Sequence, residues 1–129
     1  MTAFPTIVIE GFVPDERLSP NKKLHHMVKY RAMHRDKLIV QAYVNGSGWP
    51  MSRGAEKRRR LTITIHGLLM MDVGNLMTRC KGVIDAVVDA GRLYDGSPRY
   101  CEVVVKQERA PRKARKTVLE MEETDDAQG

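Results

Sequence analysis

The sequence predicts a small α/β (α+β) domain with one mixed β-sheet and two main helices. Runs rich in β-branched residues alternate with two longer stretches that contain few helix breakers. A chain of 129 residues supports one hydrophobic core and is too short for two domains. We expect the order β-α-β-α-β-β, with the domain at residues 1–121 and an acidic, disordered tail at residues 122–129.

The first part of the chain predicts one strand and one helix. Apolar residues are nearly continuous over residues 6–13, which indicates a strand buried on both faces. Residues 24–44 predict the first helix, one face of which is cationic. Its histidines lack a recognised metal-ligand spacing, so we interpret them as phosphate-facing or simply solvated: His25, His26 and His34.

A loop rich in Gly, Ser and Pro follows at residues 45–54. It contains the single tryptophan, Trp49, which either anchors the loop to the core or stacks on a nucleic-acid base. Four consecutive cations come next, and such a run is typical of phosphate binding. They are Lys57, Arg58, Arg59 and Arg60.

Residues 61–66 alternate between apolar and polar side chains, which predicts a half-exposed strand. We expect residues 67–71 to continue this strand and to place Asp72 at its end. Asn75 is the expected cap of the next helix, and Gly91 is the expected stop. Apolar residues at helical spacing predict that one face of this helix packs on the core: Leu76, Val83 and Val87.

The last part of the chain predicts two strands, at residues 99–109 and 117–121, that pair as a hairpin. The turn between them, at residues 110–116, is cationic and includes Arg112 and Lys113.

The bulk properties favour a nucleic-acid partner. The net charge is +6 and the isoelectric point is near 9.5, which is common in proteins that bind nucleic acid. Cys80 and Cys101 form no C-x-x-C pair, so we expect no zinc site and a reduced, cytoplasmic location. No stretch approaches the ~20 apolar residues of a membrane span, and no secretory signal is evident.

Charged residues at residues 71–100 suit a site for a divalent cation and a phosphate. Asp72 precedes the helix and Asp95 follows it, and Lys81 and Asp85 lie four residues apart on the helix. The alternative is ordinary helix caps, turns and a surface ion pair.

The same stretch resembles the signature of the RusA family of Holliday junction resolvases, which is common in phages and prophages. The family pattern runs D-x-D-N-L, a helix with Lys and D-A-L, then A-G and D-D-S-P. The matching positions are Asp72, Asn75, Leu76, Lys81, Asp85, Ala86, Ala90, Gly91, Asp95, Ser97 and Pro98. Many ordered matches are more specific than one short motif.

The resemblance implies a homodimeric, magnesium-dependent endodeoxyribonuclease that acts on four-way DNA junctions. It implies that Asp72 and Asp95 bind Mg²⁺, that Lys81 stabilises the scissile phosphate and that Asp85 helps to orient Lys81. The cations expected to contact DNA are Lys57, Arg58, Arg59, Arg60, Arg79, Arg112 and Lys113.

Two positions depart from the family pattern, because Gly74 and Gly96 replace acids that the family uses to bind magnesium. Each replacement removes a negative charge beside a divalent ion, so weak, slow or absent cleavage is the physical expectation. Two alternatives therefore stay open. One is a nuclease-dead relative that binds branched DNA, and the other is a basic RNA-binding or regulatory protein.

Overall fold

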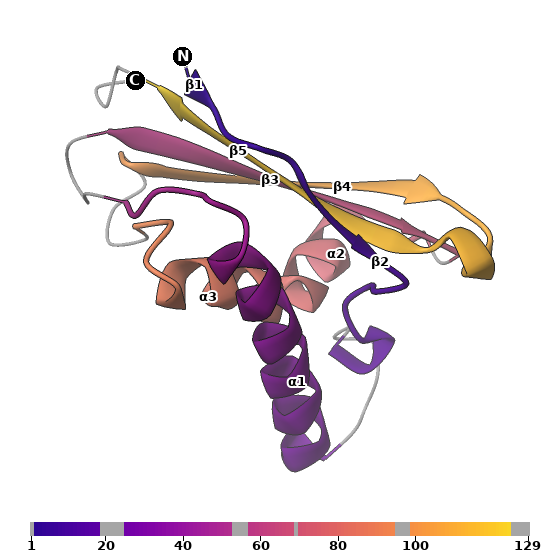
Figure 1. The fold of residues 1–129 in the computed structure, drawn as a ribbon. Coiled ribbons are helices and arrows are strands. Elements are labelled where there is room, and N and C mark those ends of the chain that lie inside the picture. Colours follow the sequence, from indigo (N-terminus) through magenta and orange to yellow (C-terminus); the bar gives the residue numbers. More distant parts are fainter. Residues whose placement is uncertain (1, 19–24, 53–56, 69, 95–98, 125–129) are drawn as a thin grey trace.

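The computed structural model describes residues 2–18, 25–52, 57–68, 70–94 and 99–124. It confirms the α+β class, because a mixed sheet carries three helices on one of its sides (Figure 1). The strands are β1 (Thr2–Ala3), β2 (Ile7–Glu10), β3 (Arg58–Gly67), β4 (Cys101–Arg109) and β5 (Lys116–Thr124). The helices are α1 (His26–Asn45), α2 (Val73–Arg79) and α3 (Lys81–Asp89), with short 3₁₀ turns η1 (Glu16–Leu18) and η3 (Arg112–Ala114).

The central strand of the sheet is β3. It pairs in parallel with β4, where Ile63 lies opposite Val105, and antiparallel with β5, where Ile63 lies opposite Leu119. The predicted hairpin of the last two strands is therefore wrong, because β3 lies between β4 and β5. One face of β3 is fully covered, since its Leu61, Ile63 and Ile65 point to the same side and are all buried, and the residues between them are only partly buried.

The first edge of the sheet is an interrupted strand. β1 and β2 pair antiparallel with successive parts of β5. The predicted strand at residues 6–13 shortens to residues 7–10, and its expected burial on both faces is wrong. Ile7 and Ile9 are buried, whereas Val8 is 41% exposed, because the helices cover only one side of the sheet (Figure 1).

The region after β3 differs from the prediction in two ways. The strand ends at Gly67 rather than continuing to residue 71. The expected single helix is two helices that meet at Cys80, whose φ of −88° and ψ of 3° are not those of a regular helix. The predicted stop is confirmed: α3 ends just before Gly91, which has a φ of +78°.

The core lies between the helices and the sheet. It combines inward residues of β3 with apolar residues of α1 and with the faces of α2 and α3 that helical spacing predicted. These include Leu61, Ile63, Ile65, Val40, Val44, Leu76, Cys80, Val83 and Val87. Trp49 is 2% exposed and its Nε1–H donates to the Pro5 carbonyl at 2.6 Å. Trp49 therefore anchors its loop to the core, and the base-stacking interpretation is wrong.

The carboxyl-terminal strand is longer than predicted. β5 continues through Thr124, so the domain extends three residues past the predicted boundary at residue 121. The reason is that Glu122 and Glu123 lie opposite Arg60 and Arg59 of β3 and form ion pairs with them. The rest of the predicted tail, residues 125–129, lies outside the described residues. None of the described helices has the length and apolar character required to cross a membrane.

Candidate functional site

Asp72 is exposed at the amino-terminal end of α2. Its Oδ1 accepts a hydrogen bond from the Asn75 backbone N–H at 2.9 Å, so Asp72 caps the helix and the predicted cap at Asn75 is wrong. Gln107 of β4 fixes the preceding residue: its side-chain oxygen accepts from the Met71 N–H at 3.0 Å, and its side-chain nitrogen donates to the Met71 carbonyl. These bonds hold the Asp72 carboxylate beside the β4 edge of the sheet.

Gly74 lies next to this carboxylate, in the first turn of α2. A Cβ at this position would lie 3.8 Å from Asp72 Oδ1 and would meet no other atom within 4 Å outside its neighbours in the helix. A side chain here therefore has room and would emerge beside Asp72. An acid at position 74 would form a pair of carboxylates, which is an oxygen-rich arrangement that suits Mg²⁺.

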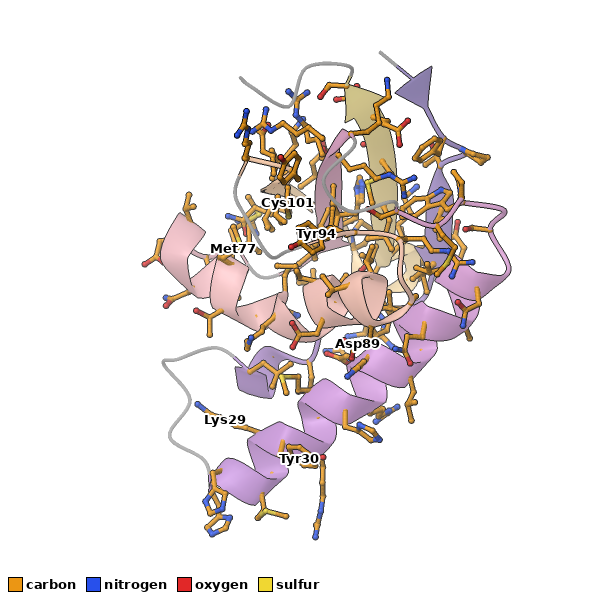
Figure 2. The ribbon with its side chains drawn as sticks, turned by 90° about the vertical axis from the view of Figure 1, so that its left-hand side faces the viewer. Lys29, Tyr30, Met77, Asp89, Tyr94 and Cys101 are labelled. Atoms are coloured by element: carbon orange, nitrogen blue, oxygen red, sulfur yellow. The ribbon has the colours of Figure 1, made fainter. Side chains whose placement is uncertain are left out.

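The charged residues of α3 form two ion pairs. Lys81 Nζ lies 3.7 Å from Asp85 Oδ2, and the Lys81 side chain is 66% exposed. Asp89 lies between α3 and α1 (Figure 2) and forms an ion pair with Lys37 of α1. The hydrogen bond that Lys37 donates to Asp89 raises the pKa of Lys37 above its usual value. Lys81 is thus open to a ligand, whereas Asp89 is used to join two helices.

The second acidic loop lies outside the described residues. Asp95 and Gly96 both fall in this segment, so the expected convergence of Asp72, Lys81 and Asp95 stays a prediction. Within the part of the chain that the structure describes, no three His, Cys, Asp or Glu side chains are grouped to hold a metal ion. Cys80 and Cys101 are free, and burial raises the pKa of the Cys80 thiol to about 12.

The arginines at the start of β3 form ion pairs with glutamates of the same sheet. Arg58 pairs with Glu102 at 3.1 Å, and Arg60 pairs with Glu102 at 3.2 Å and with Glu122 at 2.6 Å. Arg59 is 3% exposed and also pairs with a glutamate, Glu123. The prediction that Arg59 contacts DNA is wrong, because its side chain is enclosed. Arg58 and Arg60 are only partly exposed and are already paired with acids.

The other predicted DNA contacts lie elsewhere. Arg79 is 5% exposed and its Nε–H donates to the Pro14 carbonyl at 2.7 Å, so most of its side chain is enclosed. Arg112 and Lys113 are exposed in η3. η3 lies beyond the last residue of β3, because the Ala110 N–H donates to the Gly67 carbonyl at 2.9 Å. The predicted cations therefore occupy opposite ends of β3 and do not form one surface.

A cavity of about 460 Å³ lies at the η3 end of β3. Four arginines line it, and two of them were not in the predicted site. They are Arg35, Arg79, Arg112 and Arg115. Both missed arginines belong to groups of cations that are visible in the sequence: Arg35 lies in the first predicted helix, which has a cationic face, and Arg115 lies in the cationic turn at residues 110–116. These two groups meet because of the order of the strands in the sheet, and the predicted hairpin had that order wrong.

Asp36 of α1 lies in the wall of this cavity and is 4% exposed. Its Oδ2 accepts a hydrogen bond from the Asp15 N–H at 2.9 Å. Burial raises the pKa of Asp36 to about 6, although this bond and the nearby Arg35 and Arg79 favour the charged form.

Comparison with known proteins identifies no family. No protein-family model matches the chain, and no curated protein matches it. Among solved structures, the crystal structure of thiamine monophosphate kinase from Aquifex aeolicus is similar, with 12% identity and a TM-score of 0.41. The match covers 95% of this chain and 34% of the kinase chain.

Proposed function

We propose that this protein is a RusA-like, magnesium-dependent endodeoxyribonuclease that cuts four-way DNA junctions slowly. The observation that carries the proposal is the ordered motif from Asp72 to Pro98, in which Asp72 and Lys81 are both exposed. Asp72 is held by its helix cap and by the Gln107–Met71 bonds. A carboxylate fixed in this way loses little conformational entropy when it binds a cation.

The chemistry assigned to the residues follows from their charges. Asp72 and Asp95 supply carboxylate oxygens, which are the ligands that Mg²⁺ prefers. When bound, Mg²⁺ would offset negative charge on the phosphate under attack. Lys81 places its ammonium group where charge develops on that phosphate, and Asp85, 3.7 Å away, orients it.

Gly74 explains why cleavage is expected to be slow. The position next to Asp72 Oδ1 carries no carboxylate, so the cation loses one negative ligand. At an effective dielectric constant near 20, that loss corresponds to several kcal/mol of gross attraction, partly offset by desolvation. We expect the Gly74→Asp variant to cut a labelled four-way junction at least about tenfold faster than the native protein in Mg²⁺, a change of about 1.4 kcal/mol in the barrier.

Gly74→Asn is the matched control, because it adds a side chain of the same size without a charge. It should cut at the native rate. An equal gain in both variants would contradict a role for the carboxylate. No cutting by the native protein, by Gly74→Asp or by a Gly74→Asp/Gly96→Asp double variant would contradict the nuclease proposal.

A second candidate is a nuclease-dead protein that binds branched DNA. The observation that favours it is the glycine beside Asp72, which leaves Asp72 as the one proposed metal ligand in the described part of the site. Cutting by the double variant alone, with junction binding by the native protein, would support this candidate. Equal affinity for a junction and a linear duplex would contradict both candidates and favour a general RNA-binding or regulatory protein.

A further inference from the structure

The cavity at the end of β3 is formed by segments that are far apart in the chain. The loop from Gly11 to Glu16 makes one wall, α1 makes another, and the end of β3, α2 and η3 complete it. Its volume of about 460 Å³ is within the range of sites that bind small molecules or part of a polymer.

The arginines of this cavity differ from those of β3 in their partners. Arg58, Arg59 and Arg60 each pair with a glutamate. Among the described residues, by contrast, Arg35, Arg112 and Arg115 form no ion pair, and all three are exposed at the cavity. Their guanidinium groups therefore remain available to an external anion.

Two of the guanidinium groups are held in place by the wall opposite. Arg79 Nε–H donates to the Pro14 carbonyl at 2.7 Å, and Arg115 Nε–H donates to the Gly11 carbonyl at 3.0 Å. Thr117 secures the same wall by donating to the Phe12 carbonyl at 2.8 Å. A guanidinium has five N–H donors, so one anchored N–H fixes its direction while others stay free for a ligand.

The acids in the lining do not cancel this charge. Asp15, Glu16 and Asp36 also line the cavity, and all three favour the charged form of the buried Arg79, whose pKa burial lowers. Asp36 is enclosed and accepts the Asp15 N–H. Four arginines and three acids leave an excess of positive charge, and that excess is on the exposed arginines.

We infer that this arginine-lined cavity, whose lining includes neither Asp72 nor Lys81, binds the phosphodiester backbone of DNA. The inference rests on the proposed function, because it takes DNA as the ligand and adds the surface that grips it. Arginine suits phosphate because its planar fork donates two parallel hydrogen bonds to phosphate oxygens. A polyanion carries several phosphates in a row, so it can contact Arg35, Arg112 and Arg115 at the same time.

The test is junction binding by the full chain over a range of salt concentrations. The probe is a fluorescein-labelled four-way junction, and the variant is Arg112→Gln/Arg115→Gln. Each lost phosphate contact lowers the slope of log affinity against log salt by about 0.9. We expect the double variant to bind at least about tenfold more weakly, with a slope smaller by nearly two.

Three further variants test whether weaker binding comes from the loss of charge and whether it depends on where the charge is removed. Arg112→Lys/Arg115→Lys keeps both charges and should keep most of the slope. Arg35→Gln removes a cation from the opposite wall and should lower the slope by about one. Lys106→Gln removes an exposed cation from β4 and should bind as the native protein does. Thermal unfolding of each variant checks its fold.

The outcomes distinguish the two proposals. If the native protein binds the junction and the glutamine variants keep its affinity and slope, the cavity inference is overturned while the proposed function stands. If the native protein binds no DNA, both are overturned.

Discussion

Asp36 shows how burial changes a single carboxyl group. Its pKa rises from the usual 3.8 to about 6 in the folded protein. Between these values the folded state holds a proton that the unfolded state has lost. The contribution of Asp36 to stability is therefore present below about pH 4 and is lost as the pH rises through about 6.

This predicts that Asp36→Asn stabilises the protein at neutral pH. The amide stays neutral and its oxygen can still accept the Asp15 N–H. The free energy of unfolding, measured in urea, should exceed that of the native protein by about 2 kcal/mol at pH 7 and by little at pH 4. Glu10→Gln, which removes an exposed carboxylate, should give no such difference. A gain that is equal at both pH values would contradict the assignment.

Arg59 shows why the structural role of one arginine could not be predicted from a run of similar cations. Its guanidinium donates to the carbonyls of Pro50 at 2.8 Å, Met51 at 3.0 Å and Arg92 at 2.7 Å. Its Cζ also lies 4.9 Å from the centre of the Phe4 ring. In the sequence it is one of four similar cations. Only the alternation of β3, which turns its side chain toward the helices, distinguishes it from Arg58 and Arg60.

At the scale of elements, the packing of α3 on α1 depends on Gly82. A Cβ there would lie 3.0 Å from both the Met33 carbonyl oxygen and Met33 Cγ. The Met33 side chain can move, but the carbonyl belongs to the backbone of α1. An alanine would therefore push the two helices apart.

We predict that Gly82→Ala and Gly74→Ala have opposite effects, although both place alanine in a helix. Gly82→Ala should lower the free energy of unfolding by about 1–3 kcal/mol. Gly74→Ala, where the new Cβ meets only ordinary contact at 3.8 Å, should raise it by about 0.5 kcal/mol. Urea denaturation at one pH measures both. A stabilised Gly82→Ala would show that α1 and α3 can separate without cost.

At the scale of the whole molecule, local patterns predicted the elements better than their pairing. Alternation located β3, helical spacing located the core faces of α2 and α3, and Gly91 marked the end of α3. The pairing of β5 with β3 depends on contacts such as Arg60–Glu122, which join residues 62 positions apart. No local pattern encodes such a contact, and the predicted hairpin followed the shorter connection. The arginine-lined cavity was missed for the same reason.

We predict that two copies of the chain act together. A four-way junction has near two-fold symmetry, and resolving it requires two matched cuts, so we expect a homodimer that offers one Asp72–Lys81 site to each strand. Native mass spectrometry should give twice the 14.7 kDa of one chain.

A supercoiled plasmid with an extruded cruciform tests the function of that dimer, because paired cuts give linear DNA and a single cut gives a nicked circle. Gly74→Asp dimers should yield linear product. Mixed dimers in which one chain also carries Lys81→Ala should yield nicked circles, because the second strand then faces a chain that lacks the ammonium group. Linear product from the mixed dimers, or a single-chain mass at concentrations that cut the junction, would show that each cut is made by an independent chain.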